Sequence, residues 1–479
     1  MPRRPMHMTG ADGASLRAAL RELRTKLGVP AQFPPEVLAE AERAAREPRL
    51  PAADATDLPF FTIDPPSSVD LDQAMHLARR PGGYRVHYAI ADVAAFVAPG
   101  GALDAEAHRR VTTLYFPDGR VPLHPAVLSE GAASLLPAET RPALLWQLDL
   151  DAEGRVETTD VRRALVRSRA KLDYDGVQKA IDTGTAEEPL ALLADIGRLR
   201  EALERERGGI SLNVPEQEVV EHGGAYGLEY RAPLPADGWN AQISLMTGIA
   251  AADLMLATGT GILRTLPSAP DGAVARLRRA AKALGIEWPH HVPYAELVRS
   301  LDPHRPAHAA FLQECTALLR GAGYTVFAGG EIPDPAIHAA VAAPYAHCTA
   351  PLRRLVDRYS GELCLAAVAG AEPPRWAVEA LESLPREMAE GTRAANTVER
   401  ECVDLVEAAV LKDRVGETFE ATVIDIKERE PLVGTVHLAD PAVVGRVESA
   451  ARELPLGERI PVRLTAADPG TAKVLFTAV

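Results

Sequence analysis

The 479-residue sequence has few cysteines and aromatic residues, and it lacks a long uninterrupted apolar run. Its most apolar segment, residues 243–256, contains polar residues and is shorter than the ~20 apolar residues of a membrane span. Residues 2–5 lead into polar sequence rather than the apolar core of a signal peptide. We therefore expect a cytoplasmic protein that does not enter a membrane. The four cysteines are far apart and form no C-x-x-C pair, which excludes a disulfide framework and a cysteine zinc site: Cys315, Cys348, Cys364 and Cys402.

The remaining composition is that of an ordinary folded protein, with 47% hydrophobic and 25% charged residues. At about 100–200 residues per domain, the length predicts two to four domains. The net charge is −14, from 52 basic and 66 acidic residues. This balance argues against a surface covered in basic patches for duplex DNA, although it leaves room for a local basic channel.

Residues 1–54 are predicted to form a separate helical segment, because leucines recur at helical spacing from Leu16 and Gly28 and Pro34 interrupt the pattern. Two short helices with a turn between them resemble a helix-turn-helix. Residues 1–50 contain nine basic and six acidic residues, so their net charge of 9 − 6 = +3 opposes that of the whole chain. Three arginines form a stripe on the first helix, which is either a solvated face or a nucleic-acid contact: Arg17, Arg21 and Arg24.

The rest of the sequence divides into a mixed body and a β-rich end. Residues 84–90 alternate as a strand, whereas residues 174–210 and 240–415 carry helical spacing, so we expect an α+β catalytic domain over 55–415. Residues 416–479 contain five short strand-like runs, which predict a five-stranded β-barrel of the OB type. We therefore expect an α+β multidomain protein. Candidate RNA contacts on the barrel, with ordinary barrel packing as the alternative for both phenylalanines, are Phe419, Phe476, Arg446 and Arg463.

Three aspartates follow the apolar run at Phe60. Asp64 lies in a Pro-Pro turn, and Asp70 and Asp72 are two residues apart, so in an extended segment both carboxylates point to one face. Carboxylates held this close destabilise a fold unless a cation compensates them, and hard oxygen ligands select Mg²⁺ or Mn²⁺. The sequence therefore suggests a divalent metal site, with capping aspartates on a surface loop as the alternative.

A second informative stretch covers residues 344–355, where Pro351 is predicted at an early helical position after a cap at Thr349 or Ala350. Arg353 and Arg354 would then lie in the first turn, at the unfavourable end of the helix dipole. A bound anion would remove that penalty, and the planar guanidinium suits a phosphoryl group. The alternative is an exposed arginine pair balanced by nearby acids.

Together these segments resemble the RNB family of exoribonucleases, which includes ribonuclease II, ribonuclease R and the catalytic subunit of the exosome. The resemblance spans residues ~55–479 and rests on six blocks in the family order: Thr62-Ile63-Asp64 with Asp70-Leu71-Asp72, Tyr88 to Val93, Thr113 to Asp118, Ser168 to Tyr174, Tyr345 to Arg354, and Ala395 to Arg400.

The resemblance implies a metal-dependent hydrolytic 3′ to 5′ exonuclease that degrades single-stranded RNA to nucleoside 5′-monophosphates. By its motifs, Asp64, Asp70 and Asp72 would hold Mg²⁺, with Mn²⁺ as the substitute, and Asp72 would be indispensable. Arg353 would stabilise charge on the reacting phosphate. We expect no small-molecule cofactor, and we expect a monomer.

RNA-binding residues are also implied. Tyr115 matches a tyrosine that positions the 3′-terminal nucleotide, and Tyr174 matches an aromatic near the terminal bases. A buried channel that admits one strand would let an acidic protein bind RNA, because basic side chains can gather inside it. The candidates for this binding are Arg167, Arg169, Lys171, Arg354 and Ser244.

The sequence departs from the family pattern at several positions. Gln73 replaces a fourth acid, and its carbonyl can coordinate a metal without adding charge. Ser244 stands where a glutamate near the terminal base is usual, and Leu355 replaces a tyrosine after the two arginines. No cold-shock modules precede Phe60. These departures motivate an alternative function, a weak or inactive RNB-type protein that captures RNA without cleaving it; a phosphodiesterase of another substrate class would leave the tyrosines and the barrel without a purpose.

Overall fold

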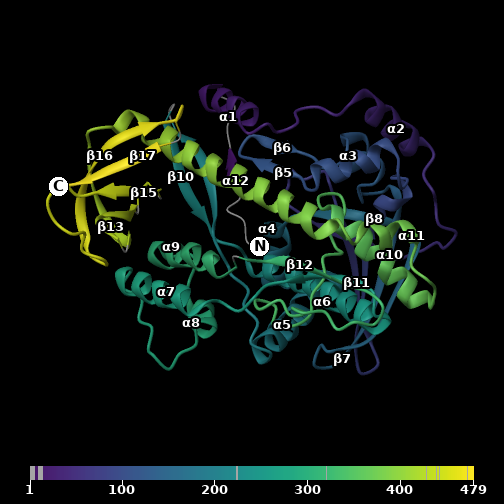
Figure 1. Cartoon of the computed structure of the whole chain (residues 1–479). Coiled ribbons are helices and arrows are strands. Elements are labelled where there is room, and N and C mark those ends of the chain that lie inside the picture. The colour runs from purple at the N-terminus through teal and green to yellow at the C-terminus, as the bar shows by residue number, and fades with distance from the viewer. Residues whose placement is uncertain are drawn as a thin grey trace.

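The computed structural model describes residues 6–8, 14–222, 225–319, 321–427, 429–438, 440–441, 443–471 and 473–479. Residues 2–5, which bear on the signal-peptide prediction, lie outside this set. Figure 1 shows a large mixed body, a β-barrel at the C-terminal end, and the long helix α12 (Leu384–Leu411) running between them.

The body is built on a closed five-stranded barrel in the order β2-β3-β4-β7-β8. Its strands are antiparallel except where β2 pairs in parallel with β8 and closes the barrel. Trp146 and Tyr88 are fully buried in its core. The strand prediction for 84–90 is confirmed, but no local pattern indicated a closed barrel in the body or its last strand at residues 156–172. The strands are β2 (Phe60–Ile63), β3 (Gln73–Arg80), β4 (Gly83–Ala91), β7 (Thr140–Asp151) and β8 (Val156–Leu172).

Helices cover this barrel and complete the body. Helix α6 lies at the centre, against α5 and α10. The main helices are α3 (Ala102–Arg110), α4 (Tyr174–Asp182), α5 (Glu188–Glu206), α6 (Pro235–Thr258), α10 (Leu355–Ala369) and α11 (Arg375–Ala380). Smaller elements are the hairpin β5 (Leu114–Phe116) with β6 (Gly119–Val121), the pair β11 (Gly261–Thr265) with β12 (Gly323–Phe327), the insert α7 (Asp271–Ala283), α8 (Tyr294–Ser300) and α9 (Pro306–Cys315), and the sheet β1 (Met6–Met8), β9 (Glu216–His222) and β10 (Ala225–Arg231).

Helix α6 is the one helix in the described part of the chain that is long and apolar enough to cross a membrane. Its apolar side chains have another role, since Ile243, Met246 and Met255 are fully buried in the core of the body. Gly248 lets a neighbouring segment lie directly on this helix. A Cβ at Gly248 would come within 2.2 Å of the Tyr345 ring, and the Gly248 carbonyl accepts a hydrogen bond from the Ala346 N–H at 3.0 Å.

The two predicted N-terminal helices are present as α1 (Ala14–Lys26) and α2 (Pro35–Arg46), but they do not form a helix-turn-helix unit. The leucines of α1 belong to a hydrophobic cluster with α12 and the β5–β6 hairpin. Val37 and Ala41 of α2 belong to a different cluster, on the barrel of the body. Each helix therefore docks separately on the body, because its apolar face finds a partner there rather than on the other helix.

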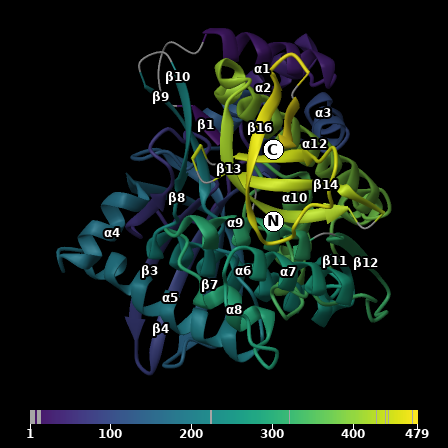
Figure 2. The same ribbon diagram turned by 90° about the vertical axis from the view of Figure 1, so that its left-hand side faces the viewer.

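The C-terminal segment forms the predicted five-stranded barrel (Figure 2). The barrel is closed, with its strands in the order β13-β14-β15-β17-β16. Phe419 and Phe476 are buried and meet edge to face, with ring centroids 6.2 Å apart. Their burial favours the alternative of ordinary barrel packing over RNA contact for both phenylalanines. The strands are β13 (Thr418–Lys427), β14 (Glu430–Leu438), β15 (Val443–Glu448), β16 (Arg459–Asp468) and β17 (Lys473–Ala478).

Candidate active site

The three aspartates lie where β2 ends and β3 begins. Asp64 directly follows β2, and its N–H donates to the Leu172 carbonyl at 3.0 Å. Asp70 and Asp72 lie in the segment that leads into β3. The Lys171 ammonium binds the carbonyls of Pro66 and Ser68, and so holds the loop between the first two aspartates in place.

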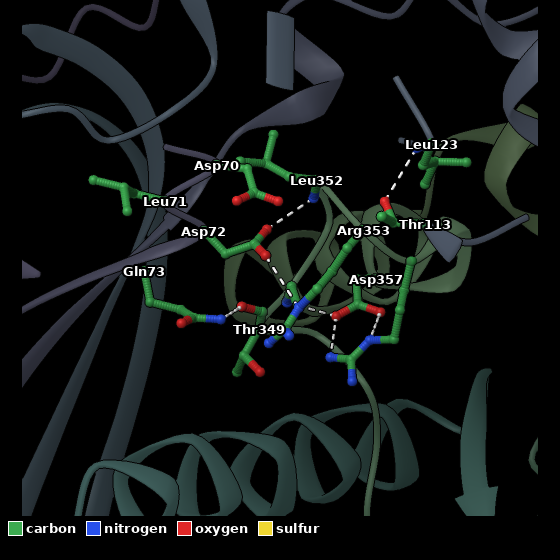
Figure 3. Close-up of polar contacts among 12 residues, drawn as sticks. Asp70, Leu71, Asp72, Gln73, Thr113, Leu123, Thr349, Leu352, Arg353 and Asp357 are labelled. Carbon is green, nitrogen blue, oxygen red and sulfur yellow. Dashed lines mark hydrogen bonds and ion pairs between the residues drawn. The ribbon is translucent and has the colours of Figure 1, made fainter. Parts of the chain in front are cut away.

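Asp72 is almost completely buried and faces the turn that precedes α10. One carboxylate oxygen accepts a hydrogen bond from the Leu352 N–H at 2.8 Å, and the other lies 3.3 Å from Nε of Arg353. Figure 3 shows the carboxylates of Asp70 and Asp72 pointing toward this turn. The Arg353 side chain is 46% exposed, so it remains partly accessible while it is tethered to Asp72. The site thus places a buried carboxylate beside a partly exposed arginine side chain.

The structure corrects the predicted start of the following helix. Residues 351–353 form a turn, and α10 begins at Leu355, so Arg353 and Arg354 precede the helix instead of occupying its first turn. The turn is fixed by one nearby and one distant carboxylate, because Asp357 accepts the Ala350 N–H at 2.7 Å and Asp72 accepts that of Leu352. The proline in the motif therefore marks a turn rather than a helix start.

Burial raises the pKa of all three carboxylates. The pKa of Asp64 and that of Asp72 are each raised to about 7, mainly by desolvation, and the charge of Asp70 adds to both shifts. The pKa of Asp70 is also raised by burial, although the Arg120 guanidinium opposes the shift. Asp70 is therefore close enough to disfavour the ionisation of Asp64 and of Asp72, in line with the like-charge repulsion that the sequence suggested.

The three side chains are not a preformed metal cage. Within the described residues, no group of three or more histidine, cysteine, aspartate or glutamate side chains is gathered closely enough to hold a metal ion. Asp70 instead forms an ion pair with Arg120, and Asp72 one with Arg353. Two guanidinium groups thus compensate part of the negative charge in this arrangement.

Gln73 and Ser244 meet at the same residue, Thr349. The side-chain amide of Gln73 donates a hydrogen bond to the Thr349 carbonyl (Figure 3). The Ser244 hydroxyl lies 2.8 Å from the Thr349 hydroxyl, and it also bonds the buried Tyr88. Gln73 is therefore engaged with the main chain through its nitrogen, and whether its oxygen coordinates a metal stays a prediction.

Tyr115 and Tyr174 both lie near site residues, Tyr115 close to Arg120 and Arg353 and Tyr174 close to Asp64. Tyr115 on β5 is 37% exposed. Tyr174 begins α4, its hydroxyl accepts a hydrogen bond from Asn240 at 3.1 Å, and its pKa is raised by burial and by the Asp64 charge. Their contact with RNA stays a prediction.

The predicted basic residues have different surroundings. Arg167 and Arg169 are exposed on β8, where Arg169 pairs with Glu187. Lys171 is occupied by the two loop carbonyls. Arg354 makes two hydrogen bonds to Asp357, at 2.7 and 2.9 Å. These contacts favour a structural role for Lys171 and Arg354 over RNA binding.

Sequence reasoning missed Arg120. Its guanidinium lies 2.6 Å from Asp70 and 2.8 Å from Glu130, so it belongs to the site. A signal was present, because Pro117-Asp118-Gly119 is a turn sequence between two short apolar runs. The hairpin that this turn predicts would place Arg120 opposite Tyr115, as the structure does.

Comparisons with known proteins agree with this architecture. Residues 52–368 match the RNB domain, and residues 417–479 match the RNase II-type exonuclease C-terminal S1 domain. Ribonuclease R of Escherichia coli (strain K12) is 26% identical over 513 aligned residues, which cover 98% of this chain and 62% of that protein. The chain thus spans less than two thirds of the length of this relative.

Solved structures share the fold. Mycoplasma genitalium RNase R in complex with ribose-methylated single-stranded RNA superposes with a TM-score of 0.83 at 19% identity, covering 97% of this chain and 78% of that one. Yeast Ssd1, a pseudonuclease, gives a TM-score of 0.65 at 17% identity, covering 88% of this chain and 54% of that one. The expected α+β architecture with a C-terminal barrel is confirmed. The chain belongs to the RNB-domain family of RNase II and RNase R exoribonucleases that carry a C-terminal S1 domain.

Proposed function

We propose that this protein is a metal-dependent hydrolase that removes nucleotides from the 3′ end of single-stranded RNA and releases nucleoside 5′-monophosphates. The observation that carries the proposal is the pairing of buried Asp72 with the partly exposed side chain of Arg353, beside Asp64 and Asp70. A phosphodiester placed here would have the Arg353 guanidinium to bind its oxygens. The three carboxylates beside it would bind a metal ion. The homology to RNase R supports this reaction class.

The donor set fits Mg²⁺, with Mn²⁺ as the substitute. All the donors are hard carboxylate oxygens. Burial raises their pKa values, and the Asp70 charge adds to the shifts of Asp64 and Asp72, which is the situation that a divalent cation relieves. Asp64, Asp70 and Asp72 would hold the ion, and Gln73 could add its neutral oxygen. When bound, Mg²⁺ supplies Lewis-acid polarisation of the phosphate and lowers the pKa of water.

The chain's own residues perform the remaining tasks. Arg353 can donate two parallel hydrogen bonds to the phosphate and stabilise its growing charge. The Leu352 N–H keeps Asp72 oriented, because it occupies one carboxylate oxygen at 2.8 Å. Tyr115 and Tyr174 would stack on the terminal nucleotide or hydrogen-bond to it. Exposed Arg167 and Arg169 would follow the phosphate backbone of the strand.

A second function is favoured by a specific observation. Gln73 and Ser244 are both neutral and both bonded to Thr349, so two positions near the acids add no charge for a metal. A protein of this kind could retain the 3′ end of an RNA without cleaving it. The pseudonuclease Ssd1 has a similar fold, so fold alone does not decide between the two functions.

The test is incubation of the protein with 3′-tailed single-stranded RNA and Mg²⁺, with EDTA and the Asp72→Asn variant as controls. A ladder of products that is lost in both controls supports the exonuclease, and mononucleotide release identifies the products. Tight binding of RNA that stays intact at every Mg²⁺ and Mn²⁺ concentration would instead establish the RNA-binding function.

A further inference from the structure

The β5–β6 hairpin presents two different faces. Side chains alternate along a strand, so Leu114 and Phe116 point to one face and Tyr115 points to the other. The first two are buried, whereas Tyr115 is 37% exposed. Tyr115 pairs directly with Arg120 across the hairpin, which places both on the same face. Arg120 in turn contacts Asp70 at 2.6 Å. One face of the hairpin is therefore apolar, and the other belongs to the candidate active site.

Helix α1 packs at the apolar face. Figure 1 shows α1 beside the β5–β6 hairpin. The leucines of α1 share a hydrophobic cluster with the buried side chains of the hairpin: Leu16, Leu20 and Leu23 of α1, and Leu114, Phe116 and Val121 of the hairpin. This cluster also contains Val398 and Cys402 of α12. The hairpin thus lies between two helices and the active site.

Arg24 adds a polar clamp at the turn of the hairpin. Its Nη2 lies 2.6 Å from Oδ1 of Asp118 and its Nη1 lies 3.2 Å from Oδ2, so the pair is bidentate. The guanidinium carbon also lies 4.1 Å from the centroid of the Phe116 ring. The two charged side chains are only 18% and 11% exposed, which limits screening by water. The Arg24 guanidinium is therefore bound to the hairpin and does not belong to a solvated stripe.

A hairpin of three-residue strands is not stable by itself. Its position must come from the elements that cover it, and the Arg24–Asp118 pair lies directly at the turn that joins Tyr115 to Arg120. Movement of this turn would displace both side chains from the carboxylates. The basic N-terminal segment thus has a structural connection to the site that its charge alone did not suggest.

We propose that α1 is a brace for the active site, in which Arg24 and Asp118 are positioning residues that keep Tyr115 and Arg120 in place. This inference rests on the proposed function, because that function assigns Tyr115 to the RNA terminus and Asp70 to the metal. The arginines of α1 were candidates for a direct RNA contact. In this proposal Arg24 instead acts through the hairpin.

The experiment compares Arg24→Ala and Arg24→Lys with Lys26→Ala. Lys26 is the matched control, because its ion pair within the described residues joins α1 to Glu401 of α12 at 3.5 Å rather than to the hairpin. For cleavage of a short RNA, we expect Arg24→Ala to raise KM about fivefold to tenfold with kcat changed less than threefold, since Tyr115 acts on the bound terminus. Arg24→Lys should restore part of the loss, and Lys26→Ala should behave as wild type.

Hydrogen exchange at residues 112–123 provides a readout that does not depend on cleavage. Faster exchange there in Arg24→Ala than in Lys26→Ala, with equal Tm values, supports the brace; equal exchange overturns it. For a long RNA, the slope of log affinity against log salt should stay unchanged in Arg24→Ala. A slope flattened by about 0.7 would identify a direct phosphate contact and overturn the proposal. A wild-type protein that fails to cleave RNA would refute the proposed function, while the exchange experiment would still test the brace.

Discussion

The side-chain amide of Gln73 donates a hydrogen bond to the main-chain carbonyl of Thr349. Thr349 is buried and lies three residues before Leu352, whose N–H orients Asp72. The Ser244 hydroxyl bonds the Thr349 side chain from helix α6. Two elements therefore fix the start of the turn that carries the candidate catalytic arginine.

Replacing Gln73 by glutamate changes both charge and hydrogen bonding. The carboxylate would attract Mg²⁺, but it could not donate to the Thr349 carbonyl, and a buried acceptor without its donor costs about 1–3 kcal/mol. We expect Gln73→Glu to lower the Mg²⁺ concentration for half-maximal rate and to reduce kcat about tenfold. Gln73→Met, which removes the donor without adding charge, should reduce kcat alone. An unchanged Mg²⁺ requirement in Gln73→Glu would place residue 73 outside the metal's reach.

Local patterns in the sequence were sufficient to predict the helices and strands that local residue spacing determines. The C-terminal strands and the two N-terminal helices follow from alternation and helical spacing, and the structure contains them. The closed barrel of the body depends on the parallel pairing of β2 with β8, whose residues are about a hundred positions apart. The docking of α1 and α2 on separate clusters is likewise a tertiary effect, because each helix has one apolar face and no local preference for a partner.

The site was predictable to a similar extent. The spacing of Asp70 and Asp72 indicated acids on one face, and the Asp70 charge raises the pKa of Asp72, which agrees with that expectation. The helix start at Pro351 was misplaced because Asp72 and Asp357 hold this turn through contacts that no local pattern contains. Arg120 could have been identified from the turn before it, but its contact with Asp70 spans 50 positions.

Asp72→Asn is expected to abolish cleavage and leave the fold intact. Asparagine keeps an oxygen that can accept the Leu352 N–H, so the turn should persist, whereas the charge needed for metal binding and for the Arg353 pair is lost. Asp72→Ala removes both the charge and the oxygen that accepts the Leu352 N–H, and it should lower Tm as well. Single-turnover cleavage and thermal melts of the two variants separate these effects; cleavage by Asp72→Asn within tenfold of wild type would contradict the assignment.

Arg353→Lys should be nearly as severe, although it retains the positive charge. The ammonium loses the planar fork that can bond two phosphate oxygens, and we expect the barrier to rise by about 2–4 kcal/mol, as for other donors to a developing oxyanion. The measurement is kcat at saturating RNA, with Arg354→Lys as the control, since Arg354 is bound to Asp357. A turnover number equal to that of wild type would make Arg353 a structural residue.

The raised pKa values predict a pH-dependent effect of metal on stability. Asp64 and Asp72 ionise near 3.8 in an unfolded chain, but their pKa is about 7 in the fold, so the folded protein binds more protons between these values. Their contribution to stability is thus fully present below pH 3.8 and is lost as the pH rises through 7. Mg²⁺ should therefore raise Tm more at pH 8 than at pH 6, and the difference should vanish in Asp64→Asn/Asp72→Asn. An equal Tm increase at both pH values would contradict this assignment.

The ion pair between Arg120 and Asp70 predicts competition between the protein's own cation and a metal. Arg120 lies 2.6 Å from the same carboxylate that would bind the ion, and like charges in one site repel. We expect Arg120→Gln to tighten Mn²⁺ binding without RNA by about threefold to tenfold at low salt, and less at high salt, where screening is stronger. Free Mn²⁺ measured by electron paramagnetic resonance gives the affinity directly.

Two controls define this prediction. Arg120→Lys keeps the charge and should bind Mn²⁺ like wild type, whereas in an Asp70→Asn background the Arg120→Gln change should have a smaller effect, because the shared carboxylate is gone. Arg120→Gln should also weaken binding of the RNA terminus, since the residue shares a hairpin face with Tyr115. Weaker Mn²⁺ binding in Arg120→Gln would mean that the guanidinium organises Asp70 for the metal instead of competing with it.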